Sequence, residues 1–469
     1  MKMWSGRFRQ PLDPEFERWQ RSFDFDRRLL EHELAGSRAY ARALKEVGVL
    51  SSVEFNSILH GLDEISAKAK SSSAFLDDPE AEDVHHFVEK QLVALIGDAG
   101  RKLHSGRSRN EQIATDLRLY VRTCVEQIRS DLAGLGEILV DRAEKAGDAA
   151  MPAYTHLQRA EPVLVAHWML AYFEMFLRDA DRLRDCGKRL NFSPLGAGAV
   201  AGTTLPLDRQ LMADGLGFAA PTANSMDATS DRDFVLEFVN DLSLLALHLS
   251  RWAEEMILFS TQEYGFIRLP EAYSTGSSAM PQKMNADLLE LTRAKAARVL
   301  GHATALQVTV KGLPLAYNKD MQETQEPLFA AAETVISLLP LVIGWMKAVD
   351  FNFERMQKAT ETGFMNAFAA ATYLVNRGVP FRLAHECVGK AVQLCLEKGN
   401  GCELADLSLE DLRKLNSAFD QDFYSSLSVG AVLAIHDVPG GTAPTQVKQA
   451  IHEAKQKLGS LREVVHAHA

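Results

Sequence analysis

Residues 112–145 read QIATDLRLYVRTCVEQIRSDLAGLGEILVDRAEK. The apolar side chains in this stretch recur in steps of three and four. They are Ile113, Leu117, Tyr120, Cys124, Ile128, Leu132, Leu135 and Leu139. Such a stripe predicts one continuous helix of about 34 residues, ~50 Å long. A helix of this length buries its stripe only against other long helices, so the segment predicts a helical bundle.

Four further segments have the same periodicity, and each predicts a long helix. They run from after Pro162 to about Leu190, from near Ser230 past Met256, from about Ala286 to Val310, and from about Pro327 to Val349. We expect Ser230 to cap its helix, with Asp233 at the capping-box position, and Pro340 to kink the last helix.

Some apolar stripes are wider than a monomeric bundle needs. The helix that begins near Ser230 also carries Leu244, Leu247 and Ile257 on a second face. Water would cover that face in a monomer. We therefore expect the long helices to associate into an oligomer.

The flanking regions differ from the centre. Residues 1–107 read as shorter helices between polar loops, residues 361–469 carry more turn signals, and few alternating strands are evident. The prediction is a mainly α protein with three domains. These are an N-terminal, mostly helical domain (1–107), a central long-helix bundle (108–360) and a small helical C-terminal domain (361–469).

Composition excludes several classes of protein. The 469 residues carry 51 basic and 62 acidic side chains, a net charge of −11, which argues against a nucleic-acid or anionic-membrane surface. The most apolar stretch, 336–346, contains a proline and is shorter than the ~20 residues that a bilayer requires. The N-terminus has no apolar signal region, and the five cysteines include no CxxC pair. We expect a cytoplasmic protein with reduced thiols and no cysteine metal site.

Three segments dense in functional side chains each precede a predicted long helix. They are 104–112 (HSGRSRNEQ), 154–159 (YTHLQR) and 276–285 (GSSAMPQKMN). Helix starts favour anions, and Arg107, Arg109 and Lys283 add positive charge suited to carboxylates. Together these features indicate a small polycarboxylate substrate.

Each segment also has an ordinary structural interpretation. A basic residue in a first turn is usually solvated, and a single histidine such as His156 is more often a hydrogen-bonded polar group than a catalyst. Ser277 does not lie in the GxSxG elbow of a hydrolase. Taken one at a time, the segments do not establish a function.

Taken together, the motifs resemble the fumarase/aspartase superfamily, whose signature loop is similar to GSSxMPxKxN. Within that superfamily they look most like the argininosuccinate lyase family. The matching stretches besides 104–112 and 276–285 are Trp4–Phe8 (WSGRF), Pro152–Pro162 (PAYTHLQRAEP), Pro194–Thr203 (PLGAGAVAGT), Asn224–Phe234 (NSMDATSDRDF), Lys311–Glu323 (KGLPLAYNKDMQE) and, more loosely, Gly440–Pro444 (GGTAP).

The resemblance implies a reaction and an assembly. The reaction is β-elimination of argininosuccinate to arginine and fumarate, a step of arginine biosynthesis, without a metal or an organic cofactor. The carbanion becomes a dianionic aci-carboxylate, so the site must offer positive charge and N–H donors where that charge develops. The assembly is a homotetramer with a helical core, in which each active site draws on three subunits.

The family loop implies that Ser277 is the base, with its alkoxide favoured by Lys283 and by N–H groups of the loop. His156 would protonate the departing nitrogen or fix its charge, and Glu290 would hydrogen-bond this histidine. The residues alone leave open which of Ser277 and His156 is the base. The substrate-binding residues implied by the motifs are Ser22, Arg109, Asn110, Thr155, Gln158, Asn285, Tyr317 and Gln322. His85 aligns with a family histidine near the site.

The chain departs from the family pattern near the expected site. Met284 and Gln325 replace lysines, and Ala286 replaces a proline. Glu161 and Glu111 stand for the usual glutamine and aspartate. Loss of two cations keeps open a related lyase that acts on another N-substituted succinate. A structural protein of the δ-crystallin kind is the rival from a different class.

Overall fold

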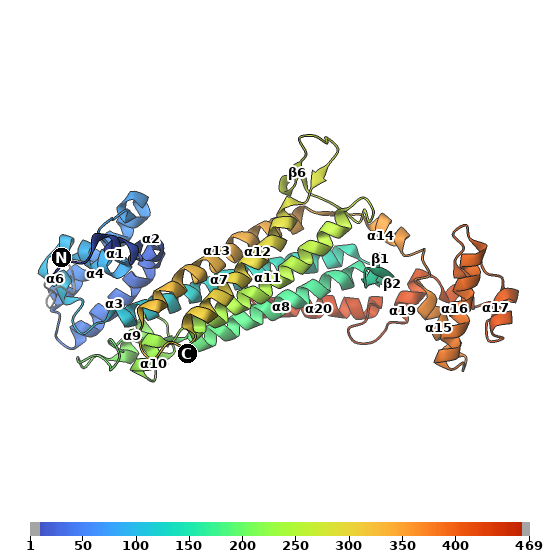
Figure 1. The fold of residues 1–469 in the computed structure, drawn as a ribbon. Coiled ribbons are helices and arrows are strands. Elements are labelled where there is room, and N and C mark those ends of the chain that lie inside the picture. The colour runs from blue at the N-terminus through green and yellow to red at the C-terminus, as the bar shows by residue number, and fades with distance from the viewer. Residues whose placement is uncertain (1–9, 462–469) are drawn as a thin grey trace.

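The computed structural model describes residues 10–461, so the Trp4–Phe8 motif lies outside the described residues. Five long helices run side by side and form the body of the molecule (Figure 1). They are α7 (Arg109–Ala146), α8 (Val165–Leu190), α11 (Asp233–Ser260), α12 (Asp287–Val310) and α13 (Gln325–Ala348). The mainly α class, the long-helix bundle and the five predicted helices are confirmed.

The longest helix, α7, is defined by clear signals at both ends. Ser108 accepts a hydrogen bond from a first-turn N–H, and the Glu111 carboxylate accepts one from the Ser108 N–H, which together form a capping box. The helix ends before Gly147, whose φ of 55° suits glycine. Its 38 residues span ~57 Å, and its apolar stripe is buried in the main core.

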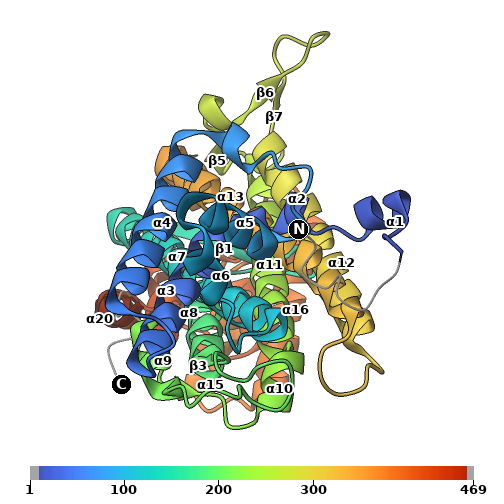
Figure 2. The same cartoon turned by 90° about the vertical axis from the view of Figure 1, so that its left-hand side faces the viewer.

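The N-terminal helices cover one end of the bundle (Figures 1 and 2). They are α1 (Pro14–Trp19), α2 (Phe23–Asp26), η1 (Arg27–Leu29), α3 (Leu30–Glu46), α4 (Ser52–Ser71), η2 (Ser73–Leu76), α5 (Val84–Ile96) and α6 (Asp98–Lys102). Helix α3 packs against the start of α7, and its buried side chains join the same hydrophobic core as the bundle. This contact brings the loops of the N-terminal region next to Arg109.

An antiparallel hairpin joins α7 to α8, where the sequence predicted few strands. Its strands are β1 (Ala150–Thr155) and β2 (Gln158–Leu164). The two-residue turn, His156–Leu157, has positive φ at both positions (55° and 58°), as in the tight turns that match strand twist. Pro152 and Pro162 face each other across the strands, and α8 begins at Val165, three residues later than Pro162.

Three other strand pairs are only two residues long. They join β3 (Phe192–Ser193) to β4 (Ala220–Pro221), β5 (Ile267–Arg268) to β8 (Asp350–Phe351), and β6 (Thr275–Gly276) to β7 (Met284–Asn285). The β6–β7 pair forms the base of a loop that projects from the bundle (Figure 1). Short elements also connect the long helices: α9 (Arg209–Gly215), α10 (Ser225–Ser230), η3 (Glu271–Tyr273) and η4 (Lys319–Thr324).

The predicted cap of α11 is wrong. Ser230 ends α10, and α11 begins at Asp233, whose backbone N–H donates to the Asp231 carboxylate at 2.7 Å. The short helix α10 has Asn224 as its N-cap, and residues 231 and 232 separate it from α11. Pro340 lies inside α13, which continues to Ala348.

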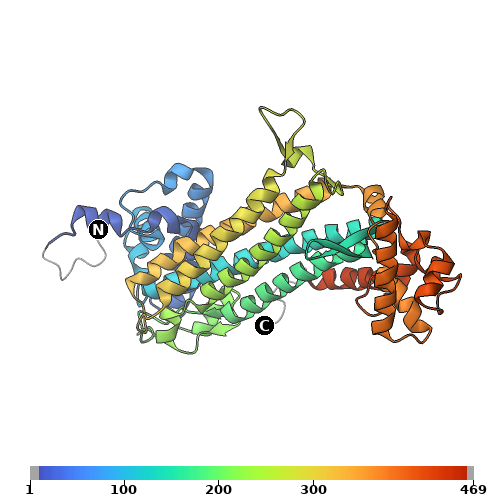
Figure 3. The same ribbon diagram turned by 45° about the vertical axis from the view of Figure 1, so that its right-hand side comes forward.

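The C-terminal part forms a second hydrophobic core at the opposite end of the bundle (Figure 3). Its elements are α14 (Phe353–Ala359), α15 (Ala367–Asn376), α16 (Phe381–Lys398), η5 (Leu404–Asp406), α17 (Leu409–Leu415), α18 (Phe423–Ser426), α19 (Val429–Ala434) and α20 (Pro444–Leu461). The second core uses side chains from 370–427, whereas α20 turns back and packs against α7 and α8. The division into three domains stays a prediction.

Apolar side chains remain on the outside of the bundle. Leu244 and Leu247 on α11 are 38% and 40% exposed, as the second apolar stripe predicts, and Ile257 is half-buried. Among the described residues, one segment, Lys319–Ala348, is long and apolar enough to cross a membrane. Because 56% of its most apolar window is buried in the bundle, it fits the core helix of a soluble protein equally well.

Candidate active site

A pocket of about 130 Å³ lies where the N-terminal helices meet the start of α7. Five of the predicted binding residues line it: Ser22, Arg109, Asn110, Tyr317 and Gln322. They come from the N-cap of α2, the first turn of α7, the loop after α12, and η4. The structure thus brings together residues that are up to 300 positions apart in the sequence.

Only one of the two terminal nitrogens of Arg109 has a partner among the described residues. Its Nη1 lies 3.2 Å from Glu82 Oε2 and 2.9 Å from Asp83 Oδ2, while Nη2 is buried without a hydrogen-bond partner among the described residues. Burial opposes the charge, but Asp83 and Glu82 raise the pKa of Arg109, so the guanidinium stays charged. Because Arg109 lines the pocket, its positive charge would attract a carboxylate that enters it.

The neighbouring polar groups are mostly engaged. The Ser22 hydroxyl donates to Asp26 at 2.6 Å, and the Asn110 amide donates to the Ala199 carbonyl at 3.2 Å. Burial and Asp83 raise the pKa of Asp26 to about 7. Gln325 is buried and lines the same pocket, and its Oε1 has no partner among the described residues. A ligand with an N–H donor would satisfy it.

Four further predicted residues lie in or near the loop between β6 and β7: Ser277 and Lys283 in the loop, Asn285 in β7 and Glu290 in the first turn of α12. The Ser277 Oγ accepts hydrogen bonds from the Ala279 and Met280 N–H groups, at 3.3 and 3.1 Å, which is the arrangement expected to stabilise an alkoxide. Asn285 donates to Thr275 Oγ1 and to the Gly276 carbonyl across the base of the loop. Lys283 and Glu290 are exposed.

His156, Thr155 and Gln158 lie at the exposed tip of the β1–β2 hairpin. The expectation that this segment directly precedes a long helix is wrong, because β2 separates it from α8. Dipole stabilisation at a helix start therefore does not apply to it. The strained left-handed turn instead presents the His156 ring to solvent.

The three groups of predicted residues lie apart within one chain. The pocket is at the start of α7, and the hairpin follows its far end, ~57 Å away along the helix axis. The β6–β7 loop projects from a third place on the bundle (Figures 1 and 3). A single subunit does not bring Ser277, His156 and Arg109 together.

Two arginines differ from the sequence interpretation. Arg107, predicted to add charge for an anion, is buried against Glu33 and Ser37 and stacks on the Tyr40 ring, so its charge is already used. Arg232, in the Asn224–Phe234 motif, is not among the binding residues that the motifs imply. It is 1% exposed, its Nη1 donates to the Asp231 carbonyl, and its Nε and Nη2 have no hydrogen-bond partner among the described residues.

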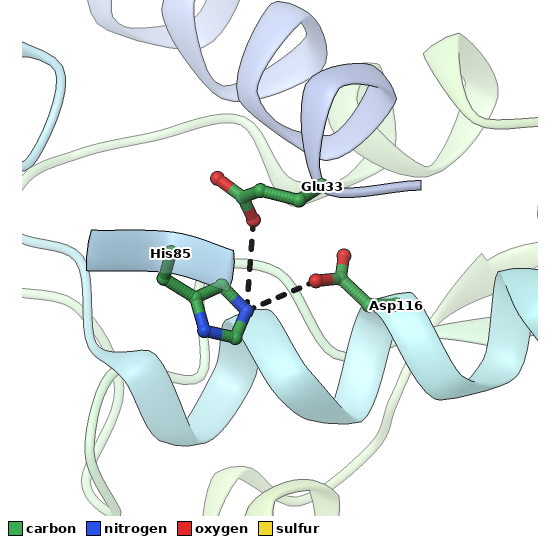
Figure 4. A group of neighbouring side chains, drawn as sticks. All are labelled: Glu33, His85 and Asp116. Carbon is green, nitrogen blue, oxygen red and sulfur yellow. Dashed lines mark hydrogen bonds and ion pairs between the residues drawn. The ribbon is translucent and has the colours of Figure 1, made fainter. Parts of the chain in front are cut away.

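One group among the described residues has the donors for a metal ion: Glu33, His85 and Asp116 (Figure 4). The Glu33 oxygens, however, accept hydrogen bonds from Ser37, Gln112 and Arg107. A guanidinium this close already supplies the positive charge that a cation would supply. The donor set therefore fits an ion-pair network better than a metal site.

Comparison with known proteins identifies the family. Sequence models described as "Lyase" and "Argininosuccinate lyase C-terminal" match residues 6–301 and 364–434. The argininosuccinate lyase of Koribacter versatilis is 60% identical over 469 residues, which cover 100% of both chains. The chain belongs to the argininosuccinate lyase family. The argininosuccinate lyase of Acidobacterium capsulatum is 58% identical and covers 98% of this chain and 96% of its own.

The matched family model and these relatives belong to the fumarase/aspartase superfamily, and solved structures share the fold of this chain. The crystal structure of EDDS lyase in complex with formate has a TM-score of 0.82 at 27% identity, covering 97% of this chain and 91% of that chain. A class II fumarase from Schistosoma mansoni has a TM-score of 0.73 at 16% identity, covering 86% and 90%, and shows the fold alone. As a member of the argininosuccinate lyase family, the chain is a lyase.

Proposed function

We propose that the protein splits argininosuccinate into arginine and fumarate. The observation that carries the proposal is the pocket at the start of α7, which the charged guanidinium of Arg109 lines together with four other predicted binding residues. This pocket receives the arginine end of the substrate, with Tyr317 beside it. The names of the most similar relatives support the same substrate.

The elimination needs one base and one acid. The Ser277 oxygen takes a proton from the carbon beside a carboxylate of the succinate part. The electron pair left behind forms the C=C bond of fumarate as the C–N bond breaks, and His156 gives a proton to the departing guanidinium nitrogen. Lys283 and the N–H groups of Ala279 and Met280 stabilise the serine alkoxide, and Glu290 orients His156.

The site is completed between subunits. Ser277, His156 and Arg109 are too far apart in one chain, and the bundle carries exposed apolar side chains that suit an interface. These include Leu244 and Leu247 on α11 and Leu300 and Val308 on α12. We infer a homotetramer with the long helices at its centre, in which each site combines a pocket, a hairpin and a loop from different chains.

We also infer that the protein works in the cytoplasm, in arginine biosynthesis. The net charge of −11 and the absence of a CxxC pair fit this compartment. Residues 1–107, 108–360 and 361–469 are proposed as its three domains.

Absorbance in the fumarate band after mixing purified protein with argininosuccinate tests the function. The expected result is fumarate release with an equal amount of arginine. A folded protein that releases none from argininosuccinate, but does from another N-substituted succinate, would favour the related lyase. Gln325 and Met284 are the specific reasons to include such substrates. A crystallin-like protein would release none from any substrate.

A further inference from the structure

A buried cluster of charged side chains lies beneath the Arg109 pocket. Glu33 on α3, His85 on α5 and Asp116 on α7 are 1%, 5% and 0% exposed, and they meet where the three helices approach one another (Figure 4). His85 Nε2 lies 3.0 Å from Asp116 Oδ2 and 3.8 Å from Glu33 Oε2. The ring is therefore held between two carboxylates.

The other side of the His85 ring faces the pocket. Its Nδ1 lies 3.8 Å from Asp83 Oδ1, and Asp83 Oδ2 lies 2.9 Å from Arg109 Nη1. Asp83 Oδ1 also accepts the His86 N–H at 2.7 Å, because Asp83 is the N-cap of α5. A continuous chain of imidazole, carboxylate and guanidinium thus links the buried cluster to the free Nη2 of Arg109.

Carboxylates outnumber arginines in this region, where Glu33, Glu82, Asp83 and Asp116 face Arg107 and Arg109. A protonated His85 lessens this excess of negative charge, and burial together with Glu33 also raises the pKa of Asp116 to about 7. Burial alone would lower the pKa of His85, but Asp116, Asp83 and Glu33 raise it well above its ordinary value.

Nearby groups do not supply the missing charge. Burial, Arg107 and Arg109 lower the pKa of His104 to about 4, which leaves it neutral. Asp26 also lies near, and burial together with Asp83 raises its pKa to about 7. Protonation of Asp26 removes a negative charge but provides no cation to hold Asp83.

We propose that His85 is a positioning residue: as a buried counter-ion it holds Asp83, and through Asp83 it orients Arg109 toward the substrate. The inference rests on the proposed function, because it needs a substrate carboxylate at Arg109. Arg109 would contact the end of the substrate that does not react. Loss of its orientation should therefore weaken binding more than it slows the chemical step.

The test compares His85→Gln, Asp83→Asn and the double variant with the wild-type chain in the fumarate assay. His85→Gln keeps a hydrogen-bond donor for Asp116 and removes the charge. We expect each single variant to raise KM about 10-fold, with kcat within about 3-fold of wild type. The double variant should have the KM of Asp83→Asn alone, because His85 acts through Asp83. His60→Gln, an exposed histidine on α4, is the matched control.

Each outcome bears on the proposal. KM effects that multiply in the double variant, or a fall of kcat without a rise of KM, would overturn it. If His85→Gln does not fold, Asp83→Asn still decides, because an unchanged KM for that variant contradicts the proposed link to Arg109. Absence of turnover in the wild-type chain would instead reject the proposed function, so the two failures are distinguishable.

Discussion

At the residue scale, the chemistry depends on how backbone and buried charges surround a few side chains. Ser277 Oγ accepts hydrogen bonds from two backbone N–H groups, those of Ala279 and Met280. Arg109 pairs with Asp83 through Nη1, whereas its Nη2 has no partner among the described residues. The first arrangement favours negative charge on the Ser277 oxygen, and the second places a positive charge beside the pocket at the start of α7.

Ser277→Ala should therefore lower kcat by about 10²–10⁴-fold, because it removes the proposed base. The melting temperature and the oligomeric state should stay nearly unchanged, since Ser277 lies in a projecting loop. Ser278→Ala, the neighbouring serine, is the control and should keep most of the activity. Joint loss of folding and activity in Ser277→Ala would mean that the serine is structural.

The buried cluster predicts a pH-dependent stability. His85 has a raised pKa in the folded protein, so its contribution is complete below its unfolded value of about 6.5 and is lost as pH rises through the folded value. The difference in melting temperature between wild type and His85→Gln should be larger at pH 6 than at pH 9. A difference that grows with pH would contradict a charged His85.

At the element scale, the β1–β2 hairpin carries His156 on a turn with two left-handed residues. Leucine at a positive φ is uncommon, because its Cβ crowds the backbone there. Leu157 is 68% exposed, so its side chain gains little from burial within the chain. The turn geometry, which aims His156, is therefore kept at a cost in stability.

Leu157→Gly should be more stable than Leu157→Ala by about 1 kcal/mol, because only glycine adopts this φ without strain. Both variants lose the leucine side chain, so their difference isolates the backbone effect. Thermal or chemical unfolding of the two proteins measures it. Equal stability would indicate that the turn relaxes when the side chain is removed.

The long helices were predictable from sequence because burial repeats every three to four residues along each of them. The hairpin was not, because its strands pair with each other and carry only a weak alternation between Ala150 and Leu164. The binding residues came from family motifs. The link from His85 through Asp83 to Arg109 depends on contacts between separate helices, which no local pattern encodes.

At the scale of the whole molecule, the apolar faces of the bundle and the separated site residues lead to the same inference. Leu244 and Leu247 lie three residues apart on α11, so they share one face, and both are exposed in the single chain. Association through this face would bury them and would bring loops and hairpins of other chains toward the α7 pocket.

Leu244→Glu together with Leu247→Glu should produce species smaller than a tetramer, with a parallel loss of activity, because charges would be buried at the interface. Analytical ultracentrifugation measures the change. Val53→Glu is the control, since Val53 is 76% exposed on α4, outside the bundle. A double variant that remains a fully active tetramer would exclude this face from the interface.

The central claim is that one active site is assembled from several chains, and mixing two inactive variants tests it most directly. Ser277→Ala and His156→Asn, each inactive alone, are unfolded, mixed in equal amounts and refolded together. If the two residues of a site come from different subunits, each of them is native in about half of the sites of an equal mixture. Both are then native in about a quarter of the sites, and fumarate release should return to about a quarter of the wild-type rate. No recovery in a mixed tetramer would mean that Ser277 and His156 of each site belong to the same chain, which would contradict the account.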